Sequence, residues 1–184
     1  ELGWELHGRK QYALVVYKAL MAAGQEIRLK NCGYRVIETL RLEKGFRSWG
    51  ADIGPDFSPD EAGLGWAVKM KTNQSFLGRE AVDALRSRRL QRKLAFFTID
   101  DPSVVLLGRE TIYRNGERVG WLSSAGWGYT VKKNIGMGYV REKAGIDERY
   151  IRSGHYELEI ATKRMPCEVH LSPLYDPEKK KMVS

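Results

Sequence analysis

The sequence predicts an α+β fold in which a mixed first part is followed by an all-β second part. Helical spacing of apolar residues is confined to the first ninety or so positions. After Arg92 the chain becomes a series of short strand-like runs with turn signals about every eight to twelve residues. The Asn115-Gly116 pair between two such runs is typical of a tight hairpin turn. Together these features indicate a small antiparallel barrel or sandwich at the C-terminal end.

Two helices and two extended segments are expected in the first fifty residues. Residues 1–7 alternate apolar with polar or small side chains, as a half-buried strand does. Residues 9–26 have apolar positions near helical spacing, and Gly24 supplies a stop signal. A second helix is expected over about residues 34–40, and it should pass into an extended segment over residues 41–46.

The remainder of the first part is expected to contain a loop, a strand and a helix. Residues 54–63 are dense in Pro, Gly and Asp and predict a loop. Residues 64–71 alternate and predict a strand, and a helix should start after Gly78. A boundary is placed inside the basic stretch at residues 88–92, which gives predicted domains 1–88 and 92–184. The strands of the second domain are expected within 93–100, 110–125, 132–142 and 154–171.

The formal net charge of +8 admits three classes of partner: nucleic acid, a membrane surface or an anionic small molecule. Much of the charge lies in "RSRRLQRK", residues 86–93, which is expected to be a solvated linker. RNA-binding aromatic motifs, Cys/His fingers and KH-type glycine loops are missing, so a nucleic-acid role would depend on charge alone. The longest apolar runs are too short to cross a bilayer. We therefore expect neither a nucleic-acid nor a membrane partner.

The sequence contains no familiar catalytic or metal-binding motif. Cys32 and Cys167 are far apart and lack CxxC spacing, which predicts two free thiols in a reducing compartment. The histidines show no ligand spacing, so no metal site is expected. There is also no hydrolase elbow, phosphate-binding loop or dinucleotide fingerprint. The histidines are His7, His155 and His170.

Polar residues within apolar segments are the remaining candidates for a binding site. Glu5 lies between Trp4 and Leu6, and it could face solvent or accept hydrogen bonds from a ligand in a pocket. Arg41, Glu43 and Arg47 could form surface ion pairs or a cationic clamp for a carboxylate. Five aromatic residues are expected to lie mostly in the core, with one or two available to a flat ligand. These are Trp49, Trp66, Trp121, Trp127 and Tyr129.

Five blocks of the sequence resemble, in order, the glycine-cleavage T-protein (aminomethyltransferase) family. The blocks are "ELGWELH", "NCGYRVIETLRLEKGFRSWGADI", "SPDEAGLGWAVKM", "FLGREAV" and "YRNGERVGWLSSAGWGYTVKKNIGMGYV". Within this family, "FRSWGADI", "IYRNGERVG" and "SPLYDPEKKKM" look most like the C-terminal portion of the sarcosine and dimethylglycine dehydrogenases. The resemblance implies the latter part of a folate-binding domain followed by a small antiparallel β-barrel.

The resemblance also implies a ligand and the residues that hold it. Tetrahydrofolate would bind with its pterin on Glu5, and Arg41 and Trp49 would lie close by. The family's catalytic aspartate and the FAD domain of the dehydrogenases come upstream of these blocks. We therefore expect no catalytic residue within this chain, and no catalysis by this chain alone.

The function implied is that of the folate-binding portion of a folate-dependent N-methyl amine dehydrogenase. The one-carbon unit of the amine would pass to tetrahydrofolate and give 5,10-methylenetetrahydrofolate. A glycine-cleavage aminomethyltransferase remains an alternative, as does a non-catalytic regulatory subunit like that of pyruvate dehydrogenase phosphatase. The expected location is the cytoplasm in a bacterium or the mitochondrial matrix in a eukaryote.

Overall fold

The structure, a computed structural model, describes residues 3–182 of the chain. Its contacts divide the chain into two compact units. The first unit combines residues 1–36 with 178–184, and the second consists of residues 37–177. Each unit is described by itself below. The predicted domain boundary at residues 88–92 remains a prediction.

The first unit is built around one helix. A 3-10 turn, η1 (Lys10–Tyr12), leads into α1 (Ala13–Ala23), which is shorter than the helix expected over residues 9–26. Gly24 follows its last residue and is the stop signal that was predicted. Residues 3–9 form no strand, so the prediction of a strand over residues 1–7 was wrong for the described residues; Glu1 and Leu2 lie outside them. Alternation identifies one apolar face, but a strand also needs a neighbouring strand to pair with its backbone. A second 3-10 turn, η3 (Lys180–Met182), lies near the C-terminus.

Helix α2 (Arg35–Lys44) is longer than expected. Residues 41–44 belong to the helix, so the predicted extended segment over residues 41–46 was wrong. The guanidinium of Arg41 bonds to Glu38 one turn earlier, which favours the helical conformation. The helix ends at Lys44, and Gly45 follows it with a φ of 67°, in the left-handed region that glycine adopts without strain.

The segment between α2 and the barrel is mostly loop. Residues 54–63 form turns, as predicted, but residues 64–71 contain only the 3-10 turn η2 (Gly65–Ala67). The predicted strand there was wrong, because none of the described strands pairs with this segment. Helix α3 (Arg79–Arg86) begins directly after Gly78, which confirms that prediction.

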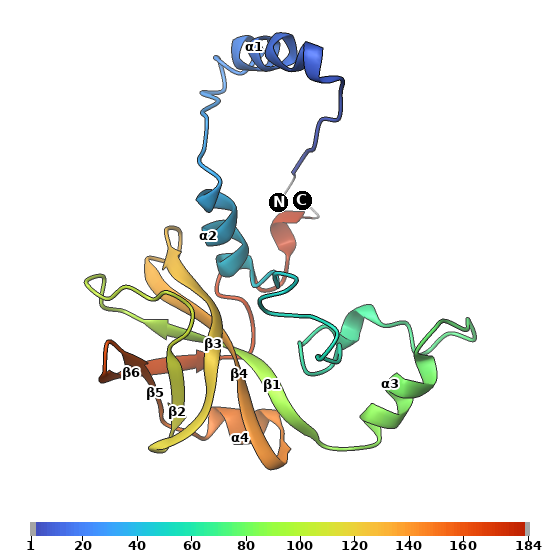
Figure 1. The fold of residues 1–184 in the computed structure, drawn as a ribbon, viewed down its shortest axis with the longest axis vertical. Helices are drawn as coiled ribbons and strands as arrows, with labels where there is room; N and C mark the ends of the chain where they lie inside the picture. The colour runs from blue at the N-terminus through green and yellow to red at the C-terminus, as the bar shows by residue number, and fades with distance from the viewer. Residues whose placement is uncertain (1–2, 183–184) are drawn as a thin grey trace. The chain divides into compact units, whose positions relative to one another are not determined.

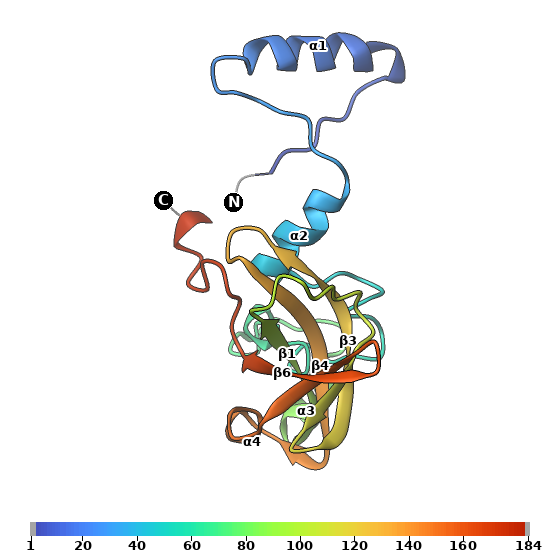
Figure 2. The same ribbon diagram turned by 90° about the vertical axis from the view of Figure 1, so that its left-hand side faces the viewer.

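Six antiparallel strands form a closed barrel, which confirms the predicted α+β class with a terminal barrel (Figures 1 and 2). The order around the barrel is β1-β4-β3-β2-β5-β6, and a short helix, α4, lies between β4 and β5 in the sequence. The bounds are β1 (Leu90–Ile99), β2 (Thr111–Arg114), β3 (Glu117–Gly128), β4 (Lys133–Ile146), α4 (Glu148–Arg152), β5 (Tyr156–Ile160) and β6 (Lys163–His170).

The hairpin signal of the sequence is confirmed. Strand β2 turns into β3 at Asn115 and Gly116, which have φ values of 52° and 85°. Positive values at both positions are those of a type I′ turn, whose twist matches that of the flanking strands. A similar pair, Ala161 and Thr162, connects β5 to β6 with φ values of 46° and 69°.

Strand β1 is buried on both faces, which places two apolar layers in the second unit. Ala95, Phe97 and Ile99 belong to the cluster that fills the barrel. Leu94 and Phe96 point the other way and pack in a second cluster that includes a residue of α2 and residues of β4. The second cluster consists of Leu42, Leu94, Phe96, Met137 and Tyr139, with Phe57 packed against it. Leu42 and Phe57 therefore cover part of the outside of the barrel wall with apolar contacts.

Candidate functional site

Glu5, the carboxylate expected to hold the pterin, is accessible in the first unit. Its side chain is 88% exposed, and its Oε2 atom lies 3.3 Å from Nε2 of His7, which is about as exposed. The residues that follow Glu5 in the chain, 6–9, line an apolar pocket of about 420 Å³ together with residues of η1 and α1; Glu5 itself does not line it. The carboxylate oxygens are free to accept hydrogen bonds from a ligand, because the pair with His7 is solvated and weak.

Arg41 lies in the second unit, at the centre of a half-buried polar network. Its guanidinium bonds to Glu38 at 2.6 Å, to Asp52 at 2.7 Å and to Ser124 of β3 at 2.8 Å. A further N–H group donates to the carbonyl of Phe46 at 3.3 Å. Every N–H group of this side chain therefore has a partner within the chain. A small pocket of about 260 Å³ opens beside this network.

Asp52 is the partner that the sequence reasoning missed. Its side chain is fully buried, and its carboxylate accepts hydrogen bonds from Arg41, from the Ser48 backbone N–H and from the Ser123 hydroxyl. Its carbonyl accepts a hydrogen bond of 2.9 Å from the hydroxyl of Tyr139, and burial raises the pKa of that phenol. The sign of this residue in the sequence was that Asp52 is the one charged residue in the stretch "SWGADIG". The network fixes the loop that carries Trp49 onto the barrel.

The charged residues that follow Arg41 are buried, so the alternative of surface ion pairs was wrong for this block. Glu43 is 2% exposed and accepts hydrogen bonds from the backbone N–H groups of Thr130 and Val131. Lys44 forms an ion pair with Asp176 at 2.6 Å in which both side chains are buried. These contacts attach α2 to the β3–β4 turn and to the segment after β6.

Most of the predicted core aromatic residues lie at the surface. Trp49 is 73% exposed, Trp66 is 71% exposed and Tyr129 is 73% exposed, so their assignment to the core was wrong. Trp121 is 40% exposed on the outside of the barrel. Trp49 shares the second unit with Arg41 and forms an isolated backbone bridge with Ile53. Its exposed ring is available to a flat ligand.

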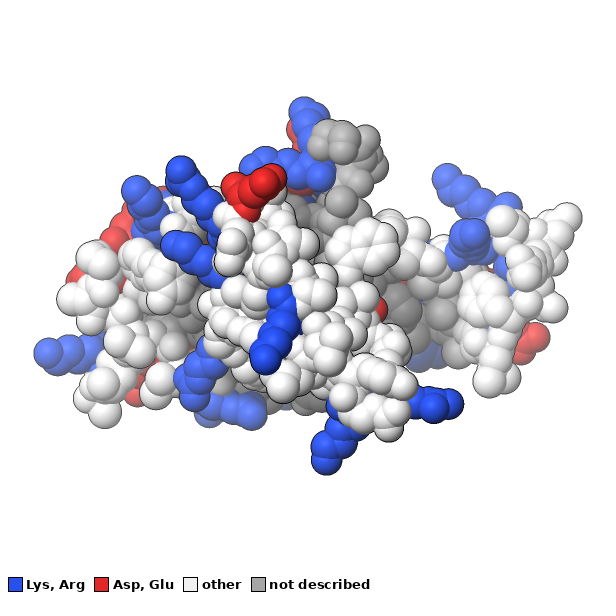
Figure 3. Space-filling model, turned by 90° about the horizontal axis from the view of Figure 1, so that it is seen from above, with Lys and Arg blue, Asp and Glu red and all other residues white. Residues whose placement is uncertain are grey.

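The basic stretch at residues 86–93 is a solvated linker only in part. Residues 87–89 are exposed between α3 and β1, as predicted, but Arg86 bonds to Asp60 at 2.9 Å, Arg92 bonds to Glu61 at 2.8 Å, and β1 already begins at Leu90. Glu61 loses hydration on burial, but hydrogen bonds from Arg92 and Ser58 outweigh this and hold the pKa of its carboxyl below the usual range. On the face drawn in Figure 3, Lys and Arg side chains project singly or in small groups between neutral areas.

Both thiols are free, which confirms the prediction for Cys32 and Cys167. Burial raises the pKa of the Cys167 thiol to about 12, so it is not a nucleophile at neutral pH. Within residues 3–182 no three His, Cys, Asp or Glu side chains gather in a way that could hold a metal ion. The helices in the same range are too short or too polar to span a bilayer.

Comparison with known proteins assigns both parts of the chain to one family. Residues 1–72 match the model of the GCVT N-terminal domain. Residues 92–176 match the model of the glycine cleavage T-protein C-terminal barrel domain. The second match covers almost the whole of the closed barrel described above, from β1 to the segment after β6.

Similar proteins of known identity agree with this assignment. The mouse mitochondrial sarcosine dehydrogenase is 44% identical over 99% of this chain, and the human mitochondrial dimethylglycine dehydrogenase is 34% identical over 95%. The chain spans about a fifth of the length of each, 20% in both cases. A crystal structure of the glycine cleavage system aminomethyltransferase T from Bartonella henselae matches 91% of the chain and 45% of its own, with a TM-score of 0.72 and 25% identity. The chain belongs to the glycine-cleavage T-protein (aminomethyltransferase) family and is similar, along nearly its whole length, to the sarcosine and dimethylglycine dehydrogenases.

Proposed function

We propose that this chain is the tetrahydrofolate-binding portion of a folate-dependent N-methyl amine dehydrogenase. The observation that carries the proposal is the 44% identity to a sarcosine dehydrogenase over 99% of the chain. Tetrahydrofolate would accept the one-carbon unit released on oxidation of the amine and leave as 5,10-methylenetetrahydrofolate. FAD would be the cofactor of that oxidation, and a part of the enzyme outside these residues would bind it. The relatives' names favour a mitochondrial location if the source is eukaryotic, and we take the compartment to be the matrix. For a bacterial source we propose the cytoplasm.

Each candidate residue has a proposed part in binding. Glu5 accepts hydrogen bonds from pterin N–H groups, which suits a carboxylate with no strong partner of its own. Trp49 offers an exposed flat ring to the ligand. Arg41 is a positioning residue, because its donors are already engaged, and it holds the loop of Trp49 through Asp52. The positive net charge attracts the anionic glutamate tail of the folate.

Binding of tetrahydrofolate to this chain, measured by calorimetry without oxygen, tests the proposal. We expect weak but saturable binding that Glu5→Gln weakens by roughly 5- to 150-fold, since loss of a charged acceptor costs about 1–3 kcal/mol. The matched control is Glu26→Gln, an exposed carboxylate in the same unit, which should bind as the unchanged chain does.

The possible failures have different meanings. If the unchanged chain does not bind tetrahydrofolate at all, the proposed function is wrong for these residues. If it binds but Glu5→Gln and Glu26→Gln have equal affinities, the role of Glu5 is wrong and the folate-binding function stands. Unfolding temperatures of both variants verify that neither change has disturbed the fold.

A further inference from the structure

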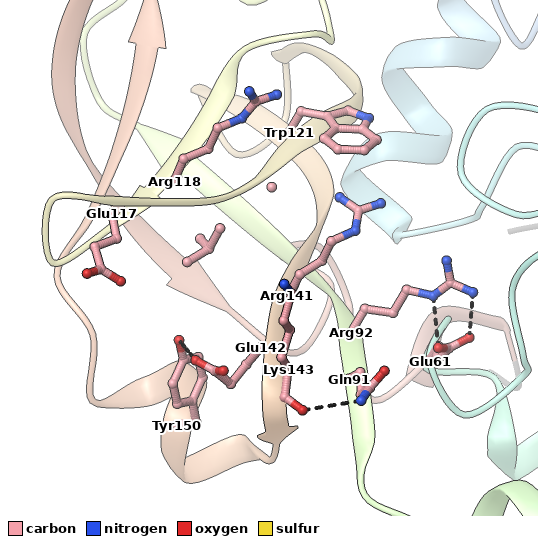
Figure 4. Close-up of a pocket in the computed structure, with 12 residues that line it drawn as sticks. Glu61, Gln91, Arg92, Glu117, Arg118, Trp121, Arg141, Glu142, Lys143 and Tyr150 are labelled. Atoms are coloured by element: carbon pink, nitrogen blue, oxygen red, sulfur yellow. Dashed lines mark hydrogen bonds and ion pairs between the residues drawn. The ribbon is translucent and has the colours of Figure 1, made fainter.

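The outer wall of the barrel has a pocket of about 710 Å³ that the proposed function does not use. It is lined by the first residues of β1 and β3, the last residues of β4, Tyr150 of α4 and Glu61 (Figure 4). All of these lie within the second unit. None is among the three residues proposed to bind folate, which are Glu5, Arg41 and Trp49.

The charges that line this pocket are not balanced. Arg92 is paired with Glu61, and the carboxylate of Glu142 accepts a hydrogen bond of 3.0 Å from the Tyr150 hydroxyl. Three cations remain, and within the described part of the chain none of them has an acidic partner within 4.0 Å. These cations are Arg118, Arg141 and Lys143. Glu117 and Glu142 likewise have no cation as an ion-pair partner among the described residues, so the lining holds four cations and three carboxylates, an excess of one positive charge.

Arg141 is the residue at which this excess is greatest. It lies directly opposite Arg92 in the β1–β4 ladder, and like charges opposite one another repel. Its guanidinium carbon is 3.9 Å from the centroid of the Trp121 ring, which holds the side chain in place. Burial, then the charges of Arg92 and Arg118, lower the pKa of Arg141. Its Nη1 atom is buried and has no hydrogen-bond partner among the described residues.

We propose that this pocket binds the oxyanion of a small molecule, a carboxylate or a phosphate, on Arg141 and Arg118. A buried donor without a partner costs free energy, and an oxyanion would satisfy it together with the neighbouring positive charge. Trp121 fixes the plane of the guanidinium, so the donors are ordered before a ligand arrives. Glu117 and Glu142 also line the pocket, and their negative charge opposes long polyanions such as nucleic acid.

Titrations of the chain with inorganic phosphate and with succinate, at constant ionic strength in chloride, test this proposal. We expect saturable shifts in the NMR signals of the Trp121 and Arg141 backbone amides with at least one of the two probes. Arg141→Gln should weaken that binding by about tenfold or more, as loss of a charged hydrogen bond predicts. Arg118 is exposed, so Arg118→Gln should fold normally and weaken binding by a smaller factor.

The matched control is Arg149→Gln, an exposed arginine of α4 that does not line the pocket. It changes the net charge equally and should alter the dissociation constant by less than about twofold. Saturation with phosphate alone, succinate alone or both would support the proposal and define the oxyanion. The proposal would be overturned by unsaturable shifts spread over the basic surface, by no shifts with either probe, or by equal effects of the three variants.

Discussion

Arg41 and Asp52 show how one buried ion pair can organise a loop and an exposed aromatic ring. The carboxylate of Asp52 has no access to solvent, so its charge is stable only because Arg41, Ser48 and Ser123 donate to it. The same pair joins α2 to the 46–52 loop and to β3. A sequence pattern could indicate that Arg41 was important, but it could not separate a ligand contact from a structural contact.

His170, at the end of β6, should make the folding stability depend on pH. Its Nε2 atom lies 2.9 Å from the hydroxyl of Thr98, and burial and Lys133 lower its pKa while Glu168 opposes them. As the pH falls, His170 therefore takes up a proton at a higher pH in the unfolded chain than in the folded chain. We expect the free energy of unfolding to decrease as the pH falls from about 7 toward 5, through the ordinary histidine pKa.

His170→Gln should reduce this slope, because glutamine can still bond to Thr98 but does not titrate. The measurement is urea denaturation at a series of pH values from about 7 to 5. His155→Gln, at an exposed histidine, is the matched control and should keep the slope of the unchanged chain. If both variants retain the full slope, His170 is not its source.

The elements differ in how much of their structure is encoded locally. The hairpin at Asn115-Gly116 and the start of α3 after Gly78 were predicted correctly, because each depends on the backbone preferences of one or two residues. The strands expected over residues 1–7 and 64–71 do not form in the described chain. Alternation cannot show whether a pairing strand is present, so it over-predicted strands where no neighbour lies alongside.

The hairpin turn provides a test of local encoding. Gly116→Ala should cost about 1–2 kcal/mol of unfolding free energy, because alanine is strained at a φ of 85° although the added methyl group meets open space. The control is Gly54→Ala, where space is also open and φ is not positive, and where alanine should be neutral or slightly stabilising. Chemical denaturation of both variants measures the difference; equal effects would contradict a conformational cause.

For the second unit as a whole, β1 and β4 each contribute side chains to both apolar layers. Phe97 lies in the barrel interior and Phe96 in the cluster outside it, and both are almost completely buried. Tyr139 of the outer cluster is also bonded to the Asp52 loop. The outer layer should therefore be as important to the stability of this unit as the barrel interior is.

Substitution of these two phenylalanines tests the equivalence of the layers. Phe96→Ala and Phe97→Ala should each reduce the unfolding free energy by about 3–5 kcal/mol, since each removes a buried ring and leaves a cavity. Phe46→Ala, at a ring that is 44% exposed, should cost about 1 kcal/mol or less. A loss for Phe96→Ala as small as that for Phe46→Ala would show that the outer cluster is not part of the core.

The sequence by itself determined the family, the α+β class and the terminal barrel, because the order of motifs along the chain indicates them. It also determined the helix after Gly78 and the hairpin turn, because each depends on the backbone preferences of neighbouring residues. Only the tertiary structure decided that the charged end of α2 is buried, that Asp52 neutralises Arg41, and that the aromatic residues expected in the core lie largely outside it. It also brought Arg92 and Arg141, which are 49 residues apart in the sequence, directly opposite each other in the β1–β4 ladder. Burial and pairing depend on which distant segments meet, and the spacing of residues along one segment does not carry that information.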